Sequence, residues 1–181
     1  MTHRTGVAIL GSTGSVGTTA LRVLARHTDR FRVAALTAFA NDDLLREQVD
    51  AFRPAFAELV KNGGGDCLVR AATRDDVDIV LNAVVGAAGL DATLAAPESG
   101  KRVALANKET VVMAGHLVRE AMERGGGEIV PVDSEHSAIL QCMSGRNGED
   151  LKRVVLTASG GPFRVWARDR VRRATADEGV K

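Results

Sequence analysis

The stretch VAILGSTGSVG, residues 7–17, decides the fold of this chain. An apolar run leads directly into a turn with glycines at positions 11, 14 and 17, and apolar residues then recur at helical spacing. Glycines permit a tight turn and let backbone N–H groups approach a phosphate, while a helix start supplies free N–H donors and positive potential. The spacing GxxGxxG is a variant of the dinucleotide fingerprint. The stretch predicts nucleotide binding, and the alternative is a tight β–α turn without a ligand.

Around this stretch, short apolar runs alternate with longer helical segments, which is typical of an α/β fold with a parallel sheet. The predicted strands are residues 7–10, 32–36, 79–84, 103–106, 128–132 and 154–157. The predicted helices are residues 16–26, 42–52, 90–99, 111–124 and 137–143. Residues 61–66 and the charged tail 164–181 are expected to be irregular. The pattern predicts a Rossmann-like, doubly wound, mostly parallel sheet.

Composition excludes several classes of function. The chain has 181 residues, a net charge of +1 and 3% aromatic residues. The low net charge gives no strong electrostatic attraction to nucleic acid or membranes, and the few aromatic side chains argue against a surface that stacks on bases. Cys67 and Cys142 lack CxxC spacing and are expected to be reduced thiols. The apolar run near the N-terminus is too short for a signal peptide, and no run approaches a membrane span. We expect a cytoplasmic protein.

The end of the second predicted strand bears on the choice between NAD and NADP. An acidic residue at that tip would bond the ribose 2′-hydroxyl and favour NAD. Here the strand continues into Phe39, Ala40 and Asn41, and acids appear only at Asp42 and Asp43, which favours NADP. No basic residue stands at the tip itself; the nearest candidate for a 2′-phosphate is Arg46.

The segment PVDSEHS, residues 131–137, follows the fifth predicted strand. In extended backbone the side chains of Asp133 and Glu135 would point to the same face, where their oxygens suit Mg²⁺ or Mn²⁺. The alternative is a polar turn, and the pattern alone leaves both interpretations open. His136 is a candidate ligand, although support of the loop by hydrogen bonding is the favoured role.

Two further clusters follow predicted strands, at the ends where open α/β sheets bind ligands. In LANKET, residues 105–110, Lys108 beside Glu109 suits substrate orientation, and the alternative is a helix start with Glu109 placed favourably against the dipole. In TASGGPF, residues 157–163, Ser159 and two glycines suit an anion-binding nest, and the alternative is an ordinary turn.

The motifs GSTGSVG, LANKET, PVDSEHSAI and LTASGGPFR, in this order, resemble the 1-deoxy-D-xylulose 5-phosphate reductoisomerase family from about Gly6 to Arg164. The resemblance implies NADPH-dependent and Mg²⁺- or Mn²⁺-dependent rearrangement and reduction of that phosphorylated sugar to 2-C-methyl-D-erythritol 4-phosphate, in isoprenoid biosynthesis, by a homodimer. It implies catalytic roles for Lys108, Asp133 and Glu135, the last two as metal ligands. The expected cofactor contacts are Gly11, Thr13, Gly14, Ser15, Val16, Gly17, Asn41, Asn107 and Glu109; the expected substrate contacts are Lys108, Ser134, Glu135 and Ser159.

The chain also departs from the family pattern. The resemblance divides it into an NADPH-binding domain, residues 1–132, and the beginning of an incomplete catalytic domain, residues 133–181. The family continues into a flap, a third carboxylate ligand and a helical domain. Segment 54–78 is shorter than the family's, which places a helix and a strand there, and Phe39 and Ala40 occupy positions where the family carries small or polar residues.

Little turnover is therefore expected from this chain alone. One alternative is an NADPH-binding module without chemistry. Another is a semialdehyde dehydrogenase, which would need a nucleophilic cysteine at a strand end. That reading is disfavoured because Cys142 falls in a predicted helix and Cys67 in an expected irregular stretch.

Overall fold

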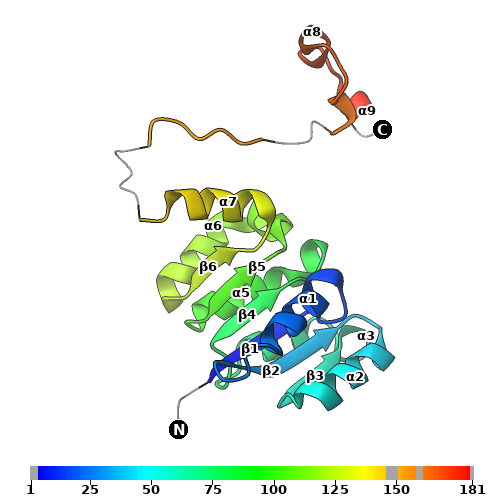
Figure 1. The fold of residues 1–181 in the computed structure, drawn as a ribbon, viewed down its shortest axis with the longest axis vertical. Helices are drawn as coiled ribbons and strands as arrows, with labels where there is room; N and C mark the ends of the chain where they lie inside the picture. The colour runs from blue at the N-terminus through cyan, green and yellow to red at the C-terminus, as the bar shows by residue number, and fades with distance from the viewer. Residues whose placement is uncertain (1–3, 146–150, 158–160, 180–181) are drawn as a thin grey trace. The chain divides into compact units, whose positions relative to one another are not determined.

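The computed structural model describes residues 4–145, 151–157 and 161–179 (Figure 1). The chain divides into two compact units, one ending at Leu140 and the other beginning at Gln141. The predicted domain boundary after Val132 stays a prediction. Within the described residues, no helix is both long enough and apolar enough to span a membrane.

The first unit is built on one six-stranded sheet whose neighbouring strands all run parallel (Figure 1). Its strands lie in the order β3-β2-β1-β4-β5-β6. This is the doubly wound order, in which the direction of winding reverses between β1 and β4, and it confirms the predicted fold class. The bounds are β1 Thr5–Leu10, β2 Phe31–Ala38, β3 Phe56–Leu59, β4 Ile79–Asn82, β5 Arg102–Leu105 and β6 Glu128–Pro131.

Helices connect these strands and cover the sheet. In the first unit they are α1 Ser15–Leu24, α2 Asp42–Phe52, α3 Val60–Gly63, α4 Asp66–Ala72, the 3₁₀ turn η1 Gly86–Gly89, α5 Leu90–Glu98 and α6 Lys108–Gly125. Helix α7, Ser134–Met143, crosses from the first unit into the second. In the second unit the described helical segments are η3 Gly161–Phe163, α8 Arg168–Val171 and α9 Ala176–Gly179.

The core has two parts, and β1 contributes to both because its side chains alternate between faces. Val7 and Ile9 belong to a cluster that also holds Leu21 of α1 and Leu45 of α2. The other cluster contains Ala8, Leu10 and buried residues of α4 and α5, among them Leu68, Ala92 and Ala96. Burial on both faces explains why β1 reads as a continuous apolar run.

Segment 54–78 corrects two expectations. It does contain a strand and helices, β3, α3 and α4, although no element was predicted there and residues 61–66 were expected to be irregular. The glycine run 63–65 separates α3 from α4 without unfolding either. Cys67 lies in α4 and is completely buried with Leu68, Ala71 and Ala72, a helical spacing that the neighbouring glycines obscured.

The predicted strand 154–157 is wrong, because residues 151–157 form no strand. A strand forms only where a neighbour takes up its backbone hydrogen bonds, and the described residues of the second unit include no other strand. Val154, Val155 and Leu156 are exposed instead. Two helices also begin three residues earlier than predicted: α6 begins at Lys108 and α7 at Ser134.

Candidate functional site

The segments that follow β1, β2, β4, β5 and β6 all emerge at one edge of the sheet because the strands are parallel. This edge carries the glycine loop, residues 11–17, and also Asn41, Asn107, Lys108 and Asp133. The fold therefore brings most of the sequence-predicted site residues to one edge. Ser159 lies outside the described residues.

The three glycines of the loop meet different surroundings. Gly11 has a φ of +85°, and a Cβ there would lie 2.9 Å from the carbonyl oxygen of Ala83 after β4. A Cβ on Gly17 would lie 2.6 Å from Ser12 Cα, with the carbonyl of Gly11 closer still. A Cβ on Gly14 would meet nothing nearer than 3.4 Å. The fold itself requires Gly11 and Gly17, whereas Gly14 is exposed and open to a ligand.

Helix α1 begins directly after this loop, and its start has neither a side-chain cap nor a nearby acidic residue in its own first turn. Gly14 is the N-cap and makes no side-chain hydrogen bond, and the first turn holds no acidic residue. The first N–H groups of a helix have no partner inside the helix, and they carry positive potential. An anionic group such as a pyrophosphate suits this position.

The segment after β2 is organised around the start of α2. Asn41 caps the helix, its Oδ1 accepting from the backbone N–H of Leu44 at 3.2 Å. Arg46, the nearest candidate for a 2′-phosphate, donates to Asp42 at 2.7 Å, and this hydrogen bond raises the pKa of Arg46. Phe39 stands 73% exposed beside them. The nearest cation indicated by the sequence is thus already paired with a carboxylate.

A buried polar network fixes the segments after β4 and β5. Asn82 of β4 donates to the carbonyl of Gly89 at 2.9 Å and to the hydroxyl of Thr93 at 2.8 Å. Asn107 donates to the carbonyls of Val84 and Gly86, the latter at 2.8 Å.

The Oδ1 of Asn107 in turn accepts from the N–H of Thr110 at 3.3 Å, which caps α6. Its side-chain amide therefore joins the start of α6 to the loop after β4. A contact of Asn107 with a cofactor stays a prediction.

Lys108 and Glu109 occupy the first turn of α6 and are exposed. Lys108 lies near enough for its charge to act on Asp133, which follows β6. Partial burial would raise the pKa of Asp133, but hydrogen bonds from the backbone N–H and ring of His136, together with the charges of His136 and Lys108, hold it below its ordinary value. Asp133 is therefore an ionised carboxylate at neutral pH, with a cation close by.

The acidic pair is not arranged as predicted. Glu135 lies inside α7 and Asp133 directly precedes it, so the extended backbone that would align the two side chains is absent. Asp133 Oδ1 accepts from His136 N at 3.0 Å and contacts its Nδ1 at 2.7 Å, which agrees with the hydrogen-bonding role favoured for His136. Ser134 begins the helix and is exposed.

The donor set is also too small to enclose a metal ion. In the part of the chain that the structure describes, no three His, Cys, Asp or Glu side chains converge to hold one. Asp133 and Glu135 together supply only some of the six to eight oxygens that a hard divalent cation takes. The metal-binding and catalytic roles of the pair stay predictions.

Sequence reasoning missed a buried polar cluster that contacts the glycine loop. Gln48 of α2 donates from Nε2 to the carbonyl of Ser12 at 3.0 Å. Ser12 and Thr37 are completely buried, and Ser12 Oγ, Thr37 Oγ1 and Gln48 Oε1 have no hydrogen-bond partner among the residues that the structure describes. The signal in the sequence was faint: Gln48 stands between Leu45 and Phe52 on the buried face of an amphipathic helix.

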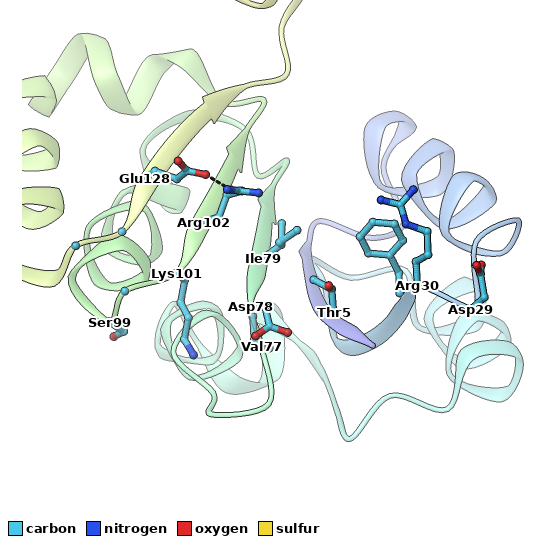
Figure 2. A pocket seen from close by; sticks show the side chains of 14 residues that line it. Thr5, Asp29, Arg30, Val77, Asp78, Ile79, Ser99, Lys101, Arg102 and Glu128 are labelled. Carbon is cyan, nitrogen blue, oxygen red and sulfur yellow. Dashed lines mark hydrogen bonds and ion pairs between the residues drawn. The ribbon is translucent and has the colours of Figure 1, made fainter. Parts of the chain in front are cut away.

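The opposite edge of the sheet holds a cavity of about 1100 Å³, lined in part by Thr5, Phe31, Ile79, Arg102 and Glu128, at or near the starts of five strands (Figure 2). Arg102 is ion-paired with Glu128, its neighbour on the adjacent strand, in the lining. None of the sequence motifs reaches this edge, so the cavity is separate from the candidate site.

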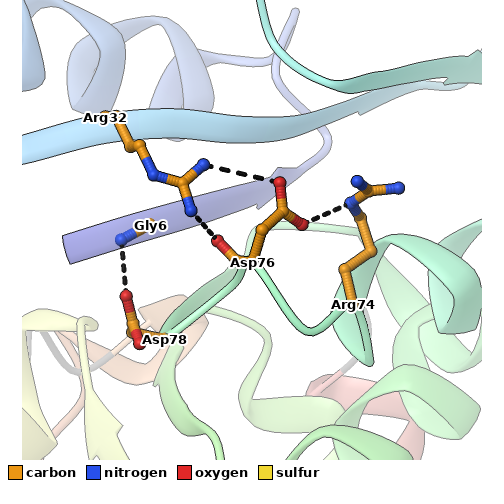
Figure 3. A network of polar contacts seen from close by, with 5 residues as sticks. All are labelled: Gly6, Arg32, Arg74, Asp76 and Asp78. Carbon is orange, nitrogen blue, oxygen red and sulfur yellow. Dashed lines mark hydrogen bonds and ion pairs between the residues drawn. The ribbon is translucent and has the colours of Figure 1, made fainter. Parts of the chain in front are cut away.

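Nearby, charged side chains tie the amino-terminal parts of β1 and β2 to the segment that leads into β4 (Figure 3). Asp76 accepts from Arg74 Nε at 2.7 Å and from Arg32 at 3.4 Å. Asp78 accepts from the N–H of Gly6 at 2.6 Å. These contacts support the fold at the end of the sheet away from the glycine loop.

Comparison with known proteins places these features in one enzyme family. The family model for 1-deoxy-D-xylulose 5-phosphate reductoisomerase matches residues 7–64 and 58–115, and the model for the C-terminal domain of that enzyme matches residues 129–181. The reductoisomerase of Geobacter metallireducens is 45% identical over 192 residues, covering 96% of this chain and 50% of that protein.

Solved structures agree. The reductoisomerase of Zymomonas mobilis in complex with NADPH superimposes with a TM-score of 0.84 at 38% identity, covering 99% of this chain and 52% of the other. A reductoisomerase in complex with NADPH, fosmidomycin and magnesium gives a TM-score of 0.79 at 36% identity, covering 98% and 50%. The chain spans about half the length of the relatives it matches.

Proposed function

Because the chain belongs to the 1-deoxy-D-xylulose 5-phosphate reductoisomerase family, we propose that it forms the NADPH-binding part of such an enzyme and one side of its active site. The observation that carries this proposal is the glycine loop, where Gly11 and Gly17 are required by close backbone contacts while Gly14 is exposed before an uncapped helix. Backbone N–H groups at the start of α1 bind the pyrophosphate, and NADPH, when bound, supplies a hydride.

The reaction proposed for the whole enzyme is the rearrangement and reduction of 1-deoxy-D-xylulose 5-phosphate to 2-C-methyl-D-erythritol 4-phosphate. On this chain, Lys108 contributes a positive charge at the first turn of α6, next to the ionised carboxylate of Asp133. This arrangement suits the binding of a phosphorylated, oxygen-rich substrate at the carboxyl-terminal edge of the sheet. Ser134 and Glu135, at the start of α7, lie beside Asp133 in the chain.

Metal binding is the weakest part of the site. If Asp133 and Glu135 bound Mg²⁺ or Mn²⁺, most of the metal's remaining ligands would be water molecules. We therefore expect weak metal affinity and little turnover from this chain alone. A module that binds NADPH without chemistry is therefore the second candidate. It is favoured by the lack of a third converging ligand among the described residues.

Two measurements test these proposals. Calorimetric titration with NADPH should show one saturable site, and no binding would refute the assignment of the glycine loop. The rate of NADPH oxidation with 1-deoxy-D-xylulose 5-phosphate and Mn²⁺ should be far below that of a full-length relative. A comparable rate would refute the expectation of an incomplete site. Substrate binding that depends on Mn²⁺ would favour the partial active site over the cofactor module.

The same proposal includes a cytoplasmic location and a homodimer. Two free cysteines, one of them buried, are compatible with a reducing compartment. Cell fractionation tests the location, and light scattering of the purified chain tests the oligomeric state. Recovery in an exported fraction, or a monomer at micromolar concentration, would count against the respective part.

A further inference from the structure

Gln48 lies in the middle of α2 and contacts the glycine loop from outside it. We propose that Gln48 is a positioning residue, which holds the glycine loop in the form that binds NADPH without touching the cofactor itself. This inference rests on the proposed function and deepens it, because it names a residue outside the loop that sets cofactor affinity.

The glycine loop is held by hydrogen bonds with two elements, β2 and α2. The N–H groups of Gly11 and Ser12 both donate to the carbonyl of Thr37 in β2, at 3.0 and 2.8 Å. Gln48 also holds Ser12, by donating a hydrogen bond from its side-chain amide to the Ser12 carbonyl at 3.0 Å. Ser12 is therefore held through its backbone N–H by β2 and through its carbonyl by α2. Loss of Gln48 would remove the hydrogen bond from α2 and leave the one to β2.

Gln48 is a polar residue on the buried, apolar side of α2. Gln48 is only 6% exposed, and its neighbours on that side of α2, Leu45, Val49 and Phe52, pack into the core. Its Oε1 is buried and has no hydrogen-bond partner in the described parts of the chain, and the same holds for the hydroxyls of Ser12 and Thr37. Burying polar atoms in this way is unfavourable. An apolar residue would serve packing alone better, so the amide N–H to the loop is the feature that requires glutamine.

The helix that carries Gln48 is also capped by Asn41, another expected cofactor contact. Asn41 caps α2, and Gln48 follows it by seven residues, which is about two helical turns on nearly the same side. One rigid helix thus carries the anchor of the glycine loop and the cap residue expected to contact NADPH. A shift of the loop relative to α2 would separate the two regions that bind one cofactor.

The test uses the whole chain with two variants that keep the size of the side chain. Gln48→Met and Gln48→Leu both lack a hydrogen-bond donor. NADPH affinity, measured by calorimetry, should fall about 3- to 10-fold, the range that one net hydrogen bond covers. Amide hydrogen exchange in residues 11–17 should become faster without cofactor. The thermal midpoint of Gln48→Met should change little, because the lost bond is offset by removal of the unpartnered Oε1.

The matched control is Asp78→Ala, which removes the acceptor of the Gly6 N–H at the opposite edge of the sheet. It should lower the thermal midpoint and leave NADPH affinity unchanged. Unchanged affinity in both Gln48 variants, with normal binding by the wild-type chain, would overturn this inference alone. An affinity loss seen only in proportion to a lower midpoint would assign Gln48 a purely structural role and also overturn it. Absence of NADPH binding by the wild-type chain would overturn both this inference and the proposed function.

Discussion

Replacing Gly17 by alanine tests whether the glycine loop must lie against α1 as the structure has it. The added methyl carbon would stand 2.6 Å from Ser12 Cα and 2.7 Å from the Ser12 carbonyl oxygen, with the Gly11 carbonyl closer still. These are backbone atoms and cannot rotate away, so either the loop or the helix must move. Overpacking of this kind costs about 1–3 kcal/mol.

Alanine also has the higher helix propensity, and Gly17 lies in the first turn of α1, which returns up to about 1 kcal/mol. We therefore expect Gly17→Ala to lose about 1–2 kcal/mol of unfolding free energy. For a chain of this length that corresponds to a thermal midpoint lower by about 2–8 °C. NADPH affinity should fall at least about 10-fold, because the N–H groups of the loop no longer converge.

Gly14→Ala is the matched control, since its methyl carbon would meet nothing nearer than 3.4 Å and its φ of −79° suits alanine. Its stability should stay within about 0.5 kcal/mol of wild type. Its NADPH affinity should nevertheless fall, because the methyl group stands on the exposed side where the pyrophosphate approaches. Calorimetry and thermal unfolding of the three proteins decide the matter. A Gly17→Ala variant with wild-type stability and affinity would refute the reasoning.

Three further predictions concern the framework. The pKa of Asp76 lies below its ordinary value because the hydrogen bonds and charges of Arg74 and Arg32 outweigh burial, so its stabilising effect is complete above about pH 3.9 and is lost as the pH falls through the folded pKa. Urea unfolding of Asp76→Asn should thus show a deficit in unfolding free energy at about pH 7 that shrinks as the pH falls below about 3.9, and a pH-independent deficit would contradict this. Asn82→Ala removes three hydrogen bonds, two of them buried, and should cost about 3 kcal/mol, against about 2 for Thr93→Val, which removes two; equal losses in denaturant titrations would count against the network. Addition of a chelator should leave the thermal midpoint unchanged, because the described residues form no metal cluster, and a lower midpoint would reveal a structural metal.

The order and direction of most elements could be predicted from the sequence, because apolar periodicity and glycine positions report local conformation directly. The starts of α6 and α7 were missed although a signal existed: Asn107 caps α6 and Asp133 precedes α7, and Asn and Asp are favoured N-cap residues. Strand β3 was missed because it has only four residues and Glu58 interrupts its short apolar run.

Other features have no local signal. Residues 154–157 have the composition of a strand, but a strand exists only with a neighbour, and composition does not supply one. The alignment of Asp133 with Glu135 was inferred from extended backbone, and the helix that begins between them removed it. Gln48 contacts Ser12 across 36 positions of the chain, a pairing that only the packed fold creates.

β6 is the outermost strand on one side of the sheet, and this position affects how ligands would be held. β1, which leads into the glycine loop, is buried along nearly its whole length, whereas β6 has no fully buried residue and neither has α7. The glycine loop is therefore held by a buried strand, while Asp133 and Glu135 stand on a segment with less buried support. Ligands at the acidic pair would bind more weakly than their charge suggests, and any second ligand that first ordered this segment would increase their affinity without contacting them.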